Sequence, residues 1–189
     1  MKSTLLFFLL CLSSLAYCQG ICLPPIDVAV TTGYIWKNDC RFKEIYGEGI
    51  QDVITVDVCG WFSECFGIGL KGSYWEAEGR TPVCRLHTNV HEIPLIGYVR
   101  REIEFDCTFA AYASLGGGII FVREKSELGK VNTDTWGGEA EIGLNYYFFK
   151  NFYLTTAFRY LYFKKKIAGI DERADFGGYG LRGGLGISF

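Results

Sequence analysis

The sequence predicts an all-β protein: an eight-stranded antiparallel up-and-down transmembrane β-barrel with an N-terminal signal peptide. Three observations lead to this fold class. Eight segments alternate between apolar and small or polar residues with a period of two, which is the period of a strand with one apolar face. Long and short connections alternate between these segments, as in membrane barrels. Many segments match the 9 to 11 residues or so that cross a bilayer, whereas a soluble strand averages about 5 or 6.

The composition fits many strands joined by tight turns. Glycine accounts for 24 of the 189 residues, well above the usual share of about 7%. Aromatic residues make up 16% of the chain, and there are four prolines. The formal net charge of −2 offers no basic field for nucleic acid, so we expect no such partner.

The first 18 residues read as a secretory signal peptide, which leaves residues 19–189 for the barrel domain. Lys2 supplies the positive charge, and residues 5–15 form an apolar core of about the expected length. Cleavage is expected after Cys18, with cleavage after Ala16 as the alternative. A lipoprotein signal with Cys18 lipidated is the rival interpretation, and the bulk of Tyr17 argues against it.

The first four expected strands follow the signal peptide. β-branched residues occupy alternate positions in residues 26–36 and 52–62. In residues 66–77, bulky apolar residues alternate with glycine, lysine and serine. Residues 90–100 form the fourth strand. Pro94 interrupts its ladder, because proline has no amide hydrogen to donate.

The next three expected strands cover residues 105–124, 135–149 and 152–165. The first of these contains Gly116, Gly117 and Gly118. Three glycines would cost a helix roughly 3 kcal/mol, so we predict a strand there and not a membrane helix.

The last strand, residues 177–189, alternates most regularly. Tyr179, Leu181, Leu185, Ile187 and Phe189 lie on its apolar face, and small or polar residues lie between them. This pattern resembles the last strand of bacterial outer-membrane barrels, in which the terminal aromatic residue is the assembly signal. The resemblance implies insertion by the barrel-assembly machinery through this strand.

The connections predict two unlike ends of the barrel. Long polar connections are expected at residues 37–51, 78–89, 125–134 and 167–176, and short turns at residues 63–65, 101–104 and 150–151. Aromatic residues near the strand ends are expected to form two girdles that contact membrane lipids. These residues are Tyr34, Trp36, Trp61, Phe62, Tyr146, Tyr147, Phe148, Phe149 and Tyr153.

Six charged residues share the inward-facing parity: Asp57, Lys71, Glu139, Glu141, Arg159 and Arg182. Counted along the sequence from the nearest short turn or from the C-terminus, five lie at similar heights, and Glu139 lies one inward step higher. An eight-stranded barrel is just wide enough for its side chains to fill it. Because an unpaired buried charge costs several kcal/mol, three acids and three bases predict an ion-pair network that plugs the lumen. A gate that opens when pairs exchange partners is the functional alternative.

Six cysteines follow the signal peptide: Cys22, Cys40, Cys59, Cys65, Cys84 and Cys107. Cys40 and Cys84 fall in the first two long connections and are candidates for a bridge, whereas Cys59 points into the lumen. The other three lie near the turn end. An exported chain meets an oxidising compartment, and six cysteines allow 15 pairings. A cross-link to an envelope neighbour, internal disulfides and free buried thiols are the alternatives. The chain has no C-x2-C pair, so no zinc or other cofactor is expected.

The signal peptide, the eight alternating strands, the charged interior and Phe189 together resemble the small outer-membrane barrels. The nearest types are the OmpA transmembrane domain, OmpX and OmpW-like porin-family proteins. The resemblance implies a location in the cell outer membrane and contact with its lipids. The stretch from Arg41 to Gly47, with Phe42, Ile45 and Tyr46, together with the cysteines, resembles envelope proteins of chlamydia-type intracellular bacteria.

The expected role is structural or surface-interacting, with a disulfide-linked envelope protein or a host surface as the partner. A small-solute diffusion channel is the first alternative, and the charged lumen argues against it. A lipid-modifying enzyme of the palmitoyltransferase or lipid A deacylase type is the second. It would need a serine and a histidine together near the outer rim. Ser73, His87 and His91 are the candidates, but Ser73 points inward and His91 outward, so no enzyme is expected.

Overall fold

The computed structural model describes residues 25–189 except 48–50, 82–83, 106–107, 128, 150 and 167–172. The expected signal peptide, Cys22 and Cys107 lie outside the described residues. Within the described part of the chain, no helix has the length and apolar character needed to cross a membrane.

The described residues include nine strands and one helix. In chain order they are β1 (Ile26–Lys37), α2 (Cys40–Tyr46), β2 (Gln51–Trp61), β3 (Phe66–Arg80), β4 (His87–Glu104), β5 (Phe109–Ser126), β6 (Gly129–Phe149), β7 (Phe152–Lys166), β8 (Arg173–Asp175) and β9 (Gly178–Ser188). The short strand β8 pairs with the last residues of β7.

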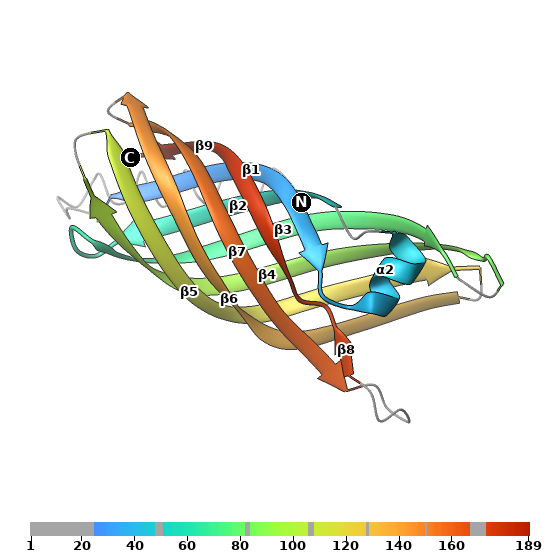
Figure 1. The fold of residues 1–189 in the computed structure, drawn as a ribbon. Coiled ribbons are helices and arrows are strands. Elements are labelled where there is room, and N and C mark those ends of the chain that lie inside the picture. Colours follow the sequence, from blue (N-terminus) through green and yellow to red (C-terminus); the bar gives the residue numbers. More distant parts are fainter. Residues whose placement is uncertain are drawn as a thin grey trace, which may run out of the picture.

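The eight long strands among these described elements form one closed barrel (Figure 1). Each strand from β1 to β7 pairs with the next in sequence, and β9 lies between β7 and β1. The pairings of the described strands are antiparallel. Closure satisfies the edges of the sheet, as a lipid environment requires. The predicted fold class, an eight-stranded antiparallel barrel, is therefore confirmed.

The two ends of the barrel differ. Helix α2 lies at one end, which we call the loop end, and the C-terminus lies at the other, the turn end (Figure 1). Short reversals join strands at the turn end. The amide of Phe62 donates to the carbonyl of Phe66 at 3.1 Å, and the amide of Phe105 donates to that of Phe109 at 2.9 Å.

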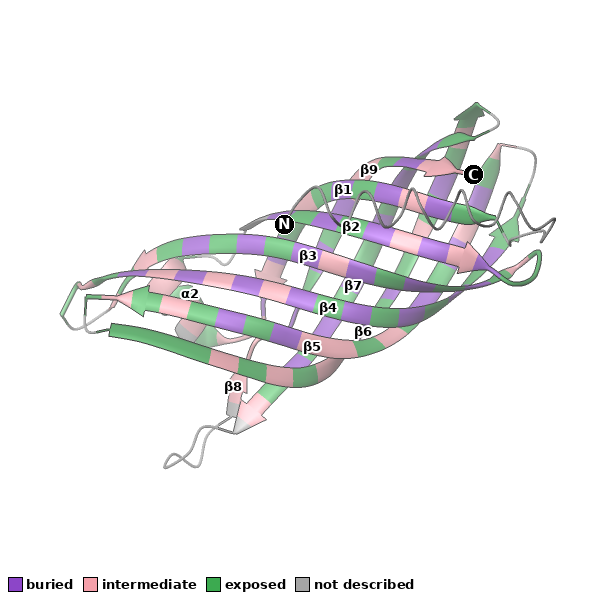
Figure 2. Cartoon of the chain, turned by 180° about the vertical axis from the view of Figure 1, so that it is seen from behind, coloured by how far each residue is buried: buried purple, intermediate pink, exposed green. Residues whose placement is uncertain are grey.

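Buried and exposed residues alternate along most of the barrel's strands (Figure 2). On β3, Leu70 is 71% exposed while the adjacent Lys71 is 2% exposed. Bulky apolar side chains thus cover the outside, and polar or charged ones point inward in the middle of the barrel. This distribution is the reverse of a soluble protein's and is the one that lipid demands.

Aromatic residues border the apolar outer band at both ends. Phenylalanine dominates the border at the turn end, and tyrosine and tryptophan dominate the border at the loop end. The exposed aromatic residues at the turn end are Phe62, Phe66, Phe105, Phe109, Tyr146, Phe148, Phe149, Phe152 and Phe189. Those at the loop end are Tyr34, Tyr74, Trp136, Tyr160, Tyr162 and Tyr179.

Trp61 and Tyr153, expected in a girdle, instead face the lumen, where they are 8% and 1% exposed. The indole of Trp61 donates to Asp27 at 2.7 Å. Tyr147 also turns inward and donates its hydroxyl to Glu102 at 2.9 Å. The indole of Trp61 and the hydroxyl of Tyr147 thus each find a buried carboxylate, whereas the hydroxyl of Tyr153 has no hydrogen-bond partner among the described residues. Aromatic character alone does not reveal which side of the barrel wall a ring takes.

The expected long connection at residues 125–134 is mostly strand. β5 continues to Ser126 and β6 begins at Gly129, whose positive φ of 143° permits the reversal. Pairing continues without a break from Ser126 opposite Gly129 down to Phe121 opposite Asp134. This hairpin extends beyond the apolar band, where its polar side chains hide the alternating pattern.

Strand β4 continues through Pro94. Pro94 pairs in register with Ile120 of β5, but on the β3 side the regular pairing is interrupted between Gly72 opposite Leu95 and Trp75 opposite Glu92. The missing amide hydrogen of proline thus interrupts one side of the ladder, as predicted, and the strand continues.

Candidate functional site

Charged side chains fill the middle of the lumen. The structure brings together the six residues that the sequence singled out, and all six are buried: Asp57, Lys71, Glu139, Glu141, Arg159 and Arg182. They come from five strands, β2, β3, β6, β7 and β9. We call this set, together with Arg100, the charged layer.

Glu141 lies at the centre of the charged layer. Its two oxygens lie 3.0 Å from Lys71 Nζ and 2.6 Å from Arg182 Nη2. Lys71 also binds Glu139, and Arg182 lies 3.3 Å from Asp57. Two bases therefore bridge three acids in a continuous chain, which offsets the cost of removing these charges from water.

Arg159 joins the charged layer to a pair of hydroxyls nearer the loop end. Its Nη1 lies 4.0 Å from Glu139 and donates to Ser73 at 3.2 Å and to Thr55 at 3.4 Å. The two hydroxyls bond to each other at 2.8 Å. The hydroxyl of Ser73 therefore binds Arg159 inside the barrel.

Arg100 also belongs to the charged layer, although it is not among the six residues predicted from the sequence. Its Nη2 lies 2.6 Å from Asp57, whose other oxygen accepts a hydrogen bond from Tyr98. The guanidinium also lies 4.4 Å from the centre of the Tyr112 ring. Arg100 was expected at the end of its strand, beside a turn. The inward parity shared with Tyr98 is the signal that would have found it.

Three inward tyrosines each lie directly opposite a glycine on the neighbouring strand. Tyr98 faces Gly69, Tyr112 faces Gly143, and Tyr153 faces Gly186. A Cβ at any of these glycines would come within 2.1 to 2.5 Å of the tyrosine ring. The glycines therefore provide the space in which the rings lie flat against the barrel wall.

An apolar layer lies between the charged layer and the loop end. Its buried members are Ile35, Val53, Trp75, Ala77, Val90, Ile96, Ile120, Val122, Leu161 and Phe163. This cluster was not predicted from the sequence, in which charged residues were expected to fill the lumen. Its residues share the inward parity, but the strands continue past the membrane band here, so the barrel is filled like the core of a soluble protein.

One ion pair is embedded in this apolar layer. Lys37 Nζ lies 2.8 Å from Glu92, donates to the carbonyl of Phe176 at 2.7 Å and sits 3.7 Å from the centre of the Trp75 ring. Lys37 and Glu92 are both fully buried. The pair ties β1 to β4 across the lumen, and the contact with Phe176 adds the segment before β9.

Helix α2 covers the loop end of the apolar layer. Phe42 packs on Tyr46 at 4.6 Å and edge-on against Trp75 at 6.1 Å between ring centres. Tyr46 donates its hydroxyl to Glu124 at 3.0 Å. Burial and the charge of Glu124 raise the pKa of Tyr46, so this hydroxyl keeps its proton. Gly47, with a positive φ of 88°, ends the helix.

Comparison with known proteins finds similarity in structure and none in sequence. No protein-family model and no curated protein matches the chain. Neisserial surface protein A matches with a TM-score of 0.58 at 12% identity, over 87% of this chain and 96% of that one. The N-terminal β-barrel domain of Pseudomonas aeruginosa OprF gives 0.55 at 14%, over 88% and 98%. Ail, the attachment invasion locus protein of Yersinia pestis, crystallised with the heparin analogue sucrose octasulfate, gives 0.56 at 11%, over 87% and 97%.

The chain has the fold of the small outer-membrane β-barrels. Nearly the full length of each neighbour is matched, so the likeness extends to the whole barrel and not to a shared hairpin. In this outer-membrane-type barrel the candidate functional site is the lumen from the charged layer to α2, together with the outer surface around it.

The cysteines of this barrel do not form the bridge considered for its first two long connections. Cys40 on α2 and Cys84 beside β4 are both exposed free thiols, and Cys65 at the turn end is also free. Cys59 is a free thiol buried in the lumen. Cys40 and Cys84 are therefore open to partners outside the chain.

The described part of the barrel does not bring a catalytic serine and histidine together. Ser73 points into the lumen, whereas the ring of His91 lies outside, 2.9 Å from the hydroxyl of Tyr74 and 3.5 Å from Glu76. His87 is exposed, with its Nε2 3.9 Å from Glu78. The described residues also contain no group of three or more metal-ligating side chains.

Proposed function

We propose that the protein is an outer-membrane barrel with a sealed lumen and a structural or surface-interacting role in the cell envelope. The observation that carries this proposal is the continuous filling of the lumen. The charged layer is followed by the apolar layer, and α2 packs over the apolar layer at the loop end.

Two physical arguments support a sealed lumen. Eight strands enclose just enough space for their own side chains, which are buried here in both layers. Separating an ion pair in the charged layer would leave buried charges unpaired, at a cost of about 3 to 5 kcal/mol. A water path would also have to displace large apolar side chains such as Trp75 and Phe163.

The outside of the barrel supports the membrane location. Apolar side chains form a band with aromatic borders, and charged residues such as Glu76, Arg123 and Lys164 follow immediately beyond it on the loop side. A closed barrel with such a band is one of the two kinds of structure that satisfy the backbone in lipid. We place the loop end outside the cell, because outer-membrane barrels keep their short turns in the periplasm.

Ion conductance in planar bilayers tests the sealed lumen. We expect the purified full-length barrel to show no steady open state. The double variant Trp75→Ala/Phe163→Ala removes the largest members of the apolar layer and should show more frequent brief openings. Trp136→Ala, at an exposed position on the outside, is the matched control and should remain silent. A steady conductance from the unchanged protein would show that it is a diffusion channel.

A further inference from the structure

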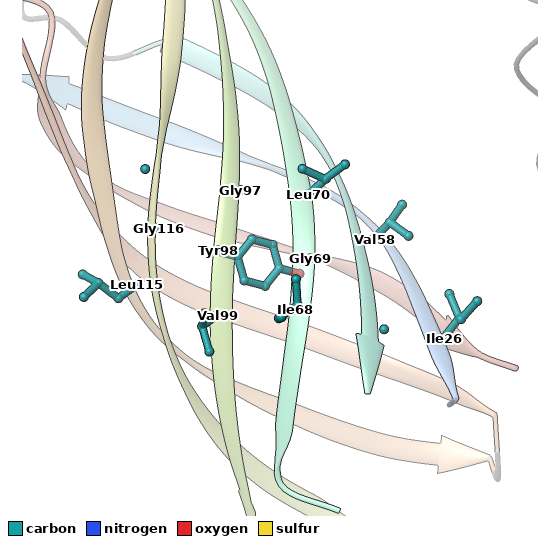
Figure 3. Close-up of a pocket in the computed structure, with 12 residues that line it drawn as sticks. Ile26, Val58, Ile68, Gly69, Leu70, Gly97, Tyr98, Val99, Leu115 and Gly116 are labelled. Atoms are coloured by element: carbon teal, nitrogen blue, oxygen red, sulfur yellow. The ribbon is translucent and has the colours of Figure 1, made fainter. Parts of the chain in front are cut away.

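Two shallow grooves cross the lipid-facing wall of the barrel. The larger has a volume of about 840 Å³, and its lining includes Gly97, Gly117, Leu70 and Leu115 (Figure 3). None of the described residues that line it carries a charge, so its chemistry does not identify an occupant. The second groove has a volume of about 510 Å³ and includes Arg101 in its lining. We call it the Arg101 groove.

Two small side chains form the floor of the Arg101 groove. Ala113 on β5 pairs with Arg101 on β4 and with Ile142 on β6, and Ala111 pairs with Leu144. Ile142 and Leu144 are 63% and 51% exposed, so they rise beside the two alanines. The depression over β5 is therefore apolar, which suits the tail of a lipid.

The Arg101 groove begins at the turn-end aromatic border. Arg101 pairs there with Phe66, a member of that border. On the opposite side the lining reaches Leu181, two residues from Tyr179 in the loop-end border. The strands of membrane barrels tilt by about 35 to 45°, so a path across neighbouring strands also changes depth. The groove thus runs from the headgroups near Arg101 into the apolar band.

Arg101 presents an isolated charge to the lipid. On the outer face of β4 it lies between Val99 and Ile103, which are 50% and 53% exposed. No other described residue between the two aromatic borders presents a charge to the outside. A lipid-facing arginine destabilises a barrel by an amount that falls towards the headgroups. A charge at this position therefore favours a counter-charge from the membrane.

The side chain of Arg101 is directed towards the headgroups. Its guanidinium carbon lies 5.5 Å from the centre of the Phe66 ring, at the turn-end border. Arg100, its neighbour in sequence, binds Asp57 inside the lumen, whereas Arg101 takes part in none of the ion pairs among the described residues. A guanidinium offers paired N–H donors that match the oxygens of a phosphate.

We propose that the Arg101 groove binds one phosphate-bearing glycerolipid of the leaflet at the turn end. The phosphate contacts Arg101, and one acyl chain lies over Ala113 between β4 and β6. With the loop end outside the cell, as proposed above, this is the periplasmic leaflet. A second copy of the chain fits less well, because a symmetric contact here would bring two Arg101 side chains towards each other. The inference is independent of whether the lumen conducts.

Native mass spectrometry of the full barrel in detergent tests the site. The probes are a phosphatidic acid and the diacylglycerol with the same two acyl chains, which differ in the phosphate. We expect a one-to-one adduct with phosphatidic acid that survives at about fivefold lower lipid concentration than the diacylglycerol adduct. Equal retention of both lipids would overturn the headgroup assignment.

Removing the charge tests the contact with the phosphate. Arg101→Gln should weaken the phosphatidic acid adduct about fivefold and leave the diacylglycerol adduct unchanged. Arg123→Gln removes an exposed cation at the loop end and is the matched control, with no effect expected. Unchanged binding in Arg101→Gln would overturn the proposal, and a loss confined to Arg123→Gln would place the lipid at the wrong end of the barrel.

Filling the groove tests the position of the tail. Ala113 faces outward, so Ala113→Leu should fold, and it should weaken the phosphatidic acid adduct at least about fivefold because it displaces buried methylene groups of the tail. Ala140→Leu, on the outer face of β6 and outside the groove, is the matched control and should bind normally. An unchanged adduct in Ala113→Leu would refute the tail position. A dimer lost in that variant would instead make the groove a seam between two copies.

A mobility shift on boiling, measured on cold SDS gels, verifies that each variant is folded. A variant that keeps the shift and loses the adduct has lost the lipid site and not the barrel. If the unchanged protein shifts on boiling but fails the lipid tests, the lipid site is wrong and the proposed membrane barrel stands.

Discussion

At the scale of single residues, the direction of each side chain decides its partners. Adjacent residues on a strand meet opposite surroundings, so that Leu70 contacts the outside while Lys71 joins the charged layer. Burying a base inside a barrel is tolerable because acids from neighbouring strands reach it. The energetic importance of a charged residue here therefore depends on how many buried partners it holds.

Arg182 holds two acids, Glu141 at 2.6 Å and Asp57 at 3.3 Å. Arg182→Met keeps much of the volume but removes the cation, so we expect a loss of about 3 to 5 kcal/mol in the free energy of unfolding. Urea unfolding of the barrel in lipid vesicles measures it. Lys43→Met, an exposed position on α2, is the control and should change stability by less than about 0.5 kcal/mol. A loss no larger than the control's would contradict the charged layer's role.

The cysteines report the accessibility and orientation of both ends. Cys40 and Cys84 at the loop end are exposed, so a membrane-impermeant maleimide should label them on intact cells. Cys65 at the turn end should react after the outer membrane is permeabilised, and Cys59 should react after unfolding, because it is 1% exposed. Peptide mapping by mass spectrometry identifies the labelled sites. Labelling of Cys65 before Cys84 would reverse the orientation proposed here.

At the scale of elements, neighbouring strands fit together because a large inward side chain on one strand lies opposite a small residue on the next. Three large inward rings have a glycine opposite them on the neighbouring strand: Tyr98, Tyr112 and Tyr153, the last of which faces Gly186 on β9. This matching fixes the register of β9, the strand that closes the barrel. Helix α2 depends on tertiary contacts in the same way, because seven residues are too few for a helix that is stable alone.

Gly186→Ala tests the matching of ring and glycine. A Cβ at this position would lie 2.1 Å from the Tyr153 ring, so the ring has to move, and we expect a loss of about 1 to 3 kcal/mol in stability. Gly183→Ala, on the outer face of the same strand, should cost less, since its Cβ meets an ordinary contact at 3.6 Å. Adding Tyr153→Leu should restore part of the loss. Equal effects of the two alanines would rule out the steric account.

Most of the fold could be predicted from sequence, because the two faces of each strand meet chemically opposite surroundings. The pattern fails where this contrast ends. Beyond the apolar band, the paired strands of the β5–β6 hairpin are surrounded by water. Their polar residues were therefore predicted to form a loop, although they form strands. Counting heights along the strands placed five charges on one level and Glu139 one inward step higher. It missed Arg100, which lay beside an expected turn, and it missed the inward apolar residues such as Trp75, which break the rule of a polar lumen.

At the scale of the whole molecule, the barrel has an apolar band outside, a charged layer and an apolar layer inside, and a helix over the loop end. The charged layer depends on closure of the barrel. Its residues come from strands in both halves of the chain, and the layer is complete when β9 pairs with both β1 and β7. In the role proposed here, the barrel presents its loops and its lipid-facing wall, and not its lumen, to other molecules.

The mobility of the membrane-extracted protein on a cold SDS gel, before and after boiling, tests the central claim most directly. The claim is that the chain forms a closed barrel embedded in the outer membrane. We predict that the protein fractionates with the outer membrane and that its band shifts on boiling, because a closed barrel resists SDS until heated. A band that does not shift, from protein recovered in the soluble periplasmic fraction, would contradict the account.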